Sequence, residues 1–99
     1  MAPVVVIGAG IGGLATAVAL AAQGQAVHVI ERDEAPGGKL RPVHIAGQAL
    51  DAGPTVMTMR DVFDGLFALA GERLDDHIRL TPLRTLARHT WPDGSCFDL

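Results

Sequence analysis

A glycine-rich turn near the start of the chain constrains its fold more than any other feature. Gly8, Gly10 and Gly13 follow the G-x-G-x-x-G spacing, after a β-branched run and before an alanine-rich segment with helical periodicity. This arrangement is typical of the strand, turn and helix that open a dinucleotide-binding βαβ unit. We therefore predict a strand over residues 3–7 and a helix over residues 11–23.

Each glycine of the turn has a separate physical role. Gly8 permits the sharp exit from the strand, a side chain at Gly10 would obstruct a diphosphate, and one at Gly13 would hold the helix away from the strand. The free N–H groups and the dipole at the start of the helix favour an anion. A purely structural turn is the alternative. The predicted diphosphate-binding residues are Gly8, Ala9, Gly10, Ile11, Gly12 and Gly13.

A second strand over residues 26–31, parallel to the first, ends in an acid. Glu31 stands 18 residues after Gly13, near the offset at which a strand-end carboxylate accepts hydrogen bonds from the adenosine ribose. Such an acid disfavours a 2′-phosphate, which favours FAD or NAD over NADP, although the neighbouring Arg32 weakens this discrimination. The alternative is an exposed acid without a ligand.

The chain then departs from the pattern of a nicotinamide dehydrogenase, in which a crossover helix should follow. Pro36 and two consecutive glycines, Gly37 and Gly38, predict a loop instead. The backbone N–H groups of these glycines can approach a phosphate, and Lys39 adds a positive charge.

Short strands and one helix make up the rest of the prediction. We expect a hairpin over residues 40–51 with Gly47 in its turn, followed by a turn-forming loop in which Gly53 suggests a close backbone approach. Thr58 resembles the first residue of a capping box for a helix over residues 59–70. We assign the apolar face of that helix to the core, with a substrate pocket or a membrane contact as alternatives. A second hairpin is expected from residue 83 onwards.

Composition and charge exclude several classes of protein. Ninety-nine residues allow one domain at most, and a net charge of −3 without a basic cluster argues against nucleic-acid binding. The single cysteine, Cys96, is typical of a reducing compartment, and we expect it to be a small apolar packing residue. The histidines show no ligand spacing, so no metal site is predicted. The uncharged first 30 residues lack a basic start and carry glycines at their centre, unlike a signal peptide or a transmembrane helix.

Taken together, the glycine turn, Glu31, the loop at 37–39 and the segment 51–55 resemble the N-terminal part of the FAD-dependent amine oxidase and phytoene desaturase superfamily. Within it, the segment 51–56 is most similar to bacterial carotenoid desaturases. The segments 57–64, 81–83 and 87–89 resemble the hydroxyneurosporene or methoxyneurosporene desaturases of purple photosynthetic bacteria. The resemblance covers essentially the whole chain.

The resemblance implies an α/β fold, namely a Rossmann-like FAD-binding βαβ unit of the glutathione-reductase type with added hairpins and one helix, incomplete in itself. Residues 1–99 would be the N-terminal part of an FAD/NAD(P)-binding domain, with its remaining strands and a substrate domain beyond Leu99. Lys39 stands where many relatives have arginine, so a point-charge contact replaces a bidentate one. Besides the turn, the implied FAD-binding residues are Glu31, Arg32, Gly38, Lys39, Gly53, Pro54 and Thr55.

The implied activity belongs to carotenoid biosynthesis. The full-length flavoprotein would be an oxidoreductase that introduces a C=C bond into an acyclic hydroxylated carotenoid, an apolar polyene, with hydride passing to FAD. No residue is a convincing general acid or base, so catalytic residues are not assigned, and the 99-residue piece alone is expected to be inactive. We expect a cytoplasmic protein with peripheral contact at the inner photosynthetic membrane. The alternatives are an amine oxidase or another flavoprotein oxidase of the superfamily, and a truncated, non-catalytic nucleotide-binding module.

Overall fold

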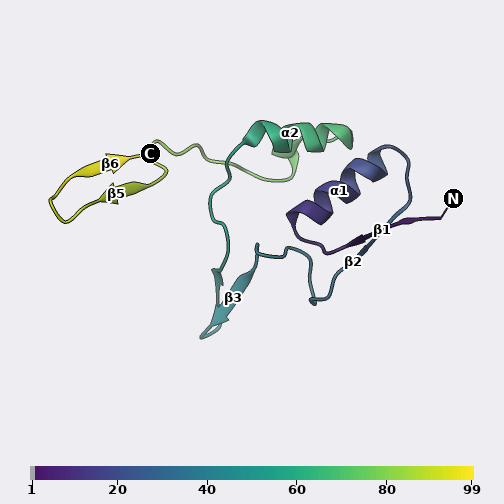
Figure 1. Cartoon of the computed structure of the whole chain (residues 1–99), viewed down its shortest axis with the longest axis horizontal. Coiled ribbons are helices and arrows are strands. Elements are labelled where there is room, and N and C mark those ends of the chain that lie inside the picture. Colours follow the sequence, from purple (N-terminus) through teal and green to yellow (C-terminus); the bar gives the residue numbers. More distant parts are fainter. Residues whose placement is uncertain (1) are drawn as a thin grey trace.

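A parallel βαβ unit opens the structure, a computed structural model that describes residues 2–99 (Figure 1). It consists of β1 (Val4–Ile7), α1 (Ile11–Ala22) and β2 (Val27–Ile30). The two strands pair in parallel along their whole length, from Val4 opposite Val27 to Ile7 opposite Ile30. The strand, helix and parallel strand predicted from the sequence are therefore confirmed, and no end is displaced by more than one residue.

Glycines fix both ends of α1. Gly8 leaves β1 with φ at +98°, a left-handed conformation that other residues rarely adopt, and its N–H donates to the Ile30 carbonyl at 2.7 Å. A Cβ on Gly13 would lie 1.9 Å from the Gly8 carbonyl oxygen, so α1 rests directly on the end of β1. Gly24, with φ at +81°, follows the helix and ends it. The roles predicted for Gly8 and Gly13 are confirmed.

Two antiparallel hairpins follow the βαβ unit. The first pairs β3 (Pro42–Ile45) with β4 (Gln48–Asp51), and its turn has positive φ at both Ala46 (51°) and Gly47 (80°), as type I′ hairpin turns require. The second pairs β5 (Arg88–Thr90) with β6 (Cys96–Asp98). There the Arg88 guanidinium donates two hydrogen bonds to the Asp98 carboxylate, at 2.6 and 2.7 Å across the strands. Cys96 is exposed, so the prediction that it packs inside is wrong.

The second helix, α2 (Arg60–Leu69), begins without the predicted capping box. Its N-cap is Met59, a left-handed residue with φ 54° and ψ 51°, and no side chain caps the helix. The start is one residue later than Thr58 would require, which moves Asp61 out of the position that reaches back to the cap. Arg60 instead fixes this end, because its guanidinium donates to Asp64 at 3.3 Å and to Asp75 at 2.6 Å. Asp75 belongs to the short 3₁₀ helix η1 (Leu74–Asp76).

Little of the apolar surface is buried. Among residues 2–99, the only buried hydrophobic residues are Ala9 and Leu74, at 3% and 2% exposure. The helix α2 lies beside α1 (Figure 1), yet Val62 and Leu69 on its apolar face remain 55% and 59% exposed, while Phe63 and others are half-buried. The assignment of that whole face to the core is therefore wrong in part. The three two-stranded sheets are separate, and the molecule extends over 63 × 34 × 23 Å.

Neither described helix combines the length and the apolar character that crossing a bilayer requires.

We predict that Gly13→Ala destabilises the fold by about 1–3 kcal/mol, because the new methyl group would overlap the Gly8 carbonyl and force α1 off β1. The matched control is Gly65→Ala in α2, where a Cβ would meet nothing within 4 Å. There the higher helix propensity of alanine should stabilise the fold by about 0.5–1 kcal/mol. Urea unfolding followed by circular dichroism compares the two variants. Equal stability would show that the contact between α1 and β1 does not need glycine.

Candidate functional site

A largely apolar cleft of about 790 Å³ lies between the start of α1, the loop at 37–40 and the segment 54–58, with Phe63 of α2 on one wall. These parts are far apart in the sequence, and the fold brings them together. Among the described residues that line the cleft, Lys39 is the only charged one. Six of the residues predicted as a binding site line this cleft: Gly10, Ile11, Gly38, Lys39, Pro54 and Thr55.

Backbone contacts without intervening side chains hold the walls of the cleft together. The Gly37 N–H donates to the Ala9 carbonyl at 2.8 Å. A Cβ on Gly38 would lie 3.0 Å from the Gly10 Cα, and one on Gly53 would lie 1.8 Å from the Lys39 carbonyl oxygen. The close approach predicted at Gly53 is therefore to another loop of the chain, and Gly53 itself does not line the cleft.

The start of α1 is open to an anion. Its N-cap, Gly10, has no side chain to cap the helix, and the first turn contains no acid. The first N–H with a partner in the helix is that of Leu14, which donates to the Gly10 carbonyl at 3.0 Å. The N–H groups of the three preceding residues therefore remain available. A Cβ on Gly10 would meet no atom of the chain nearer than 3.9 Å, so the fold itself does not require glycine there.

Glu31 does not line the cleft, and its carboxylate is hydrogen-bonded to the backbone of the glycine turn. One carboxylate oxygen, Oε2, accepts the Ala9 N–H at 2.6 Å, and the other, Oε1, accepts the Asp33 N–H at 3.1 Å. These hydrogen bonds, that of Asp33 first and then that of Ala9, hold the pKa of Glu31 below its usual value. Each oxygen keeps a further lone pair for a ligand. The side chain of Arg32 is 91% exposed, with its Nε 3.9 Å from Asp33 Oδ1.

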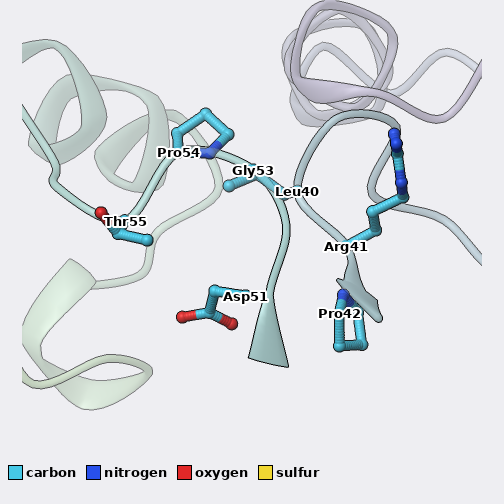
Figure 2. A pocket seen from close by; sticks show the side chains of 7 residues that line it. All are labelled: Leu40, Arg41, Pro42, Asp51, Gly53, Pro54 and Thr55. Atoms are coloured by element: carbon cyan, nitrogen blue, oxygen red, sulfur yellow. The ribbon is translucent and has the colours of Figure 1, made fainter. Parts of the chain in front are cut away.

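A second hollow of about 330 Å³ adjoins the cleft at the base of the first hairpin. Leu40, Pro54 and Thr55 line both spaces, so these residues form the partition between them. Figure 2 shows the side chains of Arg41 and Asp51 directed to different sides of this hollow. Three predicted FAD-binding residues, Gly53, Pro54 and Thr55, line this hollow. Sequence reasoning did not assign its other residues to a site, although the pairing of β3 with β4 places Pro42 opposite Asp51.

Sequence reasoning also missed part of the cleft wall. Val56 and Met57 line the cleft. They lie in the segments 51–56 and 57–64 that carry the family resemblance, but neither was assigned to the site. Phe63 had a signal, because a pocket was one alternative for the apolar face of α2. Among residues 2–99, no three His, Cys, Asp or Glu side chains gather closely enough to hold a metal ion.

Comparison with known proteins identifies the family. A family model described as an NAD(P)-binding Rossmann-like domain matches residues 6–72, which include the glycine turn, β2 and the whole cleft lining. The chain belongs to this family.

The Rossmann-like domain is also similar to carotenoid desaturases. It is 58% identical to hydroxyneurosporene desaturase of Rhodobacter capsulatus and 52% identical to that of Cereibacter sphaeroides, each over 96 residues, or 97% of this chain and 19% of the relative. It is 43% identical over 98 residues to the lycopene-forming phytoene desaturase of Pseudescherichia vulneris, or 99% of this chain and 20% of the relative. The chain thus spans about a fifth of the length of these relatives. The resemblance to carotenoid desaturases and the Rossmann-like α/β fold predicted from the sequence are confirmed.

We predict that the stabilisation contributed by Glu31 depends on pH. Because its folded-state pKa is lowered, this contribution should be complete above the usual value of 4.5 and be lost as the pH falls through the lower value in the fold. The free energy of unfolding of the wild type and of Glu31→Gln is measured from neutral pH to about pH 2. The difference between them should shrink on acidification. A difference that stays constant would contradict the ionic hydrogen bonds to Ala9 and Asp33.

Proposed function

We propose that this Rossmann-like domain binds FAD in the cleft and forms the FAD-binding part of a carotenoid desaturase, which introduces a C=C bond into an acyclic hydroxylated carotenoid. The observation that carries this proposal is the cleft itself, which joins the open start of α1 to Lys39 and to the segment 54–58. Because the chain spans about a fifth of the desaturases it resembles, the activity is proposed for the polypeptide that contains it, with residues 1–99 as the N-terminal part of its cofactor domain.

The residues present fit FAD. The free N–H groups at the start of α1 and the charge of Lys39 would hold the diphosphate, and Glu31 would accept hydrogen bonds from the ribose. After β2 the chain enters a loop and a hairpin rather than a crossover helix, so the cleft continues from the diphosphate position to Thr55. This apolar extension suits an isoalloxazine ring. The flavin, when bound, supplies the acceptor for a hydride.

The lining also suits a polyene. Val56, Met57 and Phe63 are apolar, and methionine adapts its shape to irregular apolar surfaces. Lys39 is the only titratable side chain of the lining, which favours a reaction in which the protein orients the substrate and the cofactor supplies the reactivity.

We further propose a cytoplasmic protein that contacts the inner membrane peripherally, supported by the exposed apolar side chains Val62 and Leu69 of α2.

Co-expression tests the activity. The full-length polypeptide is produced in a host that accumulates hydroxyneurosporene, and chromatography with absorbance detection should show a product with one more conjugated double bond. A parallel assay measures hydrogen peroxide released with amine substrates. An unchanged carotenoid together with oxidised amines would contradict the desaturase and favour an amine oxidase.

We predict that Gly10→Ala in the full-length protein abolishes FAD retention without unfolding the domain. The chain itself leaves space at this position, with no atom within 3.9 Å of an added Cβ, whereas the diphosphate would need that space. Flavin released from purified protein is measured by fluorescence. The control, Gly65→Ala on the open side of α2, should keep its flavin. Equal flavin content in both variants would remove the turn from the cofactor site.

A further inference from the structure

The Ala9 residue in the glycine turn is held from both sides. Its N–H donates to Glu31 Oε2 at 2.6 Å, and its carbonyl accepts the Gly37 N–H at 2.8 Å. The Ala9 N–H belongs to the peptide group between Gly8 and Ala9, and the Ala9 carbonyl belongs to the peptide group between Ala9 and Gly10. The two peptide planes that flank Ala9 are therefore oriented by residues outside the turn. Ala9 is also one of the two buried hydrophobic residues of the described chain, at 3% exposure.

The carboxylate of Glu31 connects this turn to the segment after β2. Its contact with Ala9 spans 22 residues of sequence, and its second oxygen accepts the Asp33 N–H at 3.1 Å. Hydrogen bonds to an ionised acceptor are shorter and stronger than those between neutral groups. Glu31 does not line the cleft, so it reaches the anion-binding end of α1 only through the Ala9 backbone.

We propose that Glu31 is a positioning residue for the diphosphate site. Through the Ala9 N–H, its carboxylate holds the turn in the geometry that presents the N–H groups of α1 to an anion, separately from any contact with the ribose. This inference rests on the proposed function in one respect, because the proposed function identifies the anion as the diphosphate of a dinucleotide.

The two hydrogen bonds explain why a carboxylate is needed rather than an amide. Both Glu31 oxygens accept from backbone N–H groups. Glutamine has the same size but only one oxygen, so its NH₂ group must face the N–H of either Ala9 or Asp33. One hydrogen bond is then lost and two donors are brought together. Whichever way the amide turns, Glu31→Gln breaks one of the two hydrogen bonds and leaves the other without its charge, with minimal change of shape.

Hydrogen exchange of the Ala9 amide tests the contact in the full-length polypeptide without ligand. The protein is labelled with ¹⁵N-alanine, and exchange is followed by nuclear magnetic resonance. We expect the Ala9 amide to exchange about tenfold faster in Glu31→Gln, because its hydrogen bond to a carboxylate is either lost or replaced by a weaker one to an uncharged amide oxygen. The control, Glu34→Gln, removes the same charge from an exposed side chain of the same loop and should leave Ala9 unchanged. Equal exchange in the wild type and Glu31→Gln would overturn the proposal.

Binding of inorganic pyrophosphate, which has no ribose, tests the consequence for the site. Calorimetry should show about tenfold weaker pyrophosphate binding in Glu31→Gln and no weakening in Glu34→Gln. Removing a negative charge should by itself favour an anion, so weaker binding identifies a loss of geometry.

The outcomes separate this proposal from the proposed function. A Glu31→Gln variant that loses FAD but binds pyrophosphate as tightly as the wild type would show that Glu31 acts on the ribose alone, and would overturn the positioning role. A wild type that binds pyrophosphate but not FAD would contradict the proposed cofactor and leave the positioning role standing.

Discussion

The arrangement of the candidate site depends on backbone hydrogen bonds at one buried residue. The Ala9 N–H donates to the Glu31 carboxylate, and the Ala9 carbonyl accepts the Gly37 N–H. The end of β1, the end of β2 and the following loop therefore meet at this residue. The next contacts, between Gly10 and Gly38 and between Lys39 and Gly53, continue outward from this point. Because all of these contacts except the one to the Glu31 carboxylate join main chain to main chain, the cleft keeps its shape although few side chains around it are buried.

Local signals predicted the βαβ unit almost to the residue. The β-branched run specifies β1, the glycine spacing specifies the turn, and Gly24 ends α1, each within a few residues of the feature it determines. The start of α2 was not predictable in this way. Thr58 offered a local cap, but Arg60 has partners at Asp64 and at Asp75, and the second of these lies 15 residues away. A pattern that considers only neighbouring residues does not register such a tertiary contact.

The same distinction applies to the site. The sequence marked Glu31 by its spacing and Gly53 as a glycine in a turn-forming loop. In the fold, Glu31 accepts the Ala9 N–H and Gly53 lies against the Lys39 carbonyl, and no motif can indicate such backbone groups. The position of Phe63 was ambiguous for another reason: a periodic apolar face is the same in sequence whether it meets a core or lines a cleft. Its assignment required the segment 54–58 to be placed against it.

The separation of the three two-stranded sheets has a consequence for how the molecule unfolds. No strand ladder joins β1 and β2 to either hairpin, so each sheet can open without breaking the hydrogen bonds of the others. Heating should then melt the hairpins separately from the βαβ unit, whose own unfolding remains a cooperative transition. A ligand in the cleft would contact both the end of the βαβ unit and the segment that leaves the first hairpin. It would couple these two units, and its binding free energy would appear as increased cooperativity of melting.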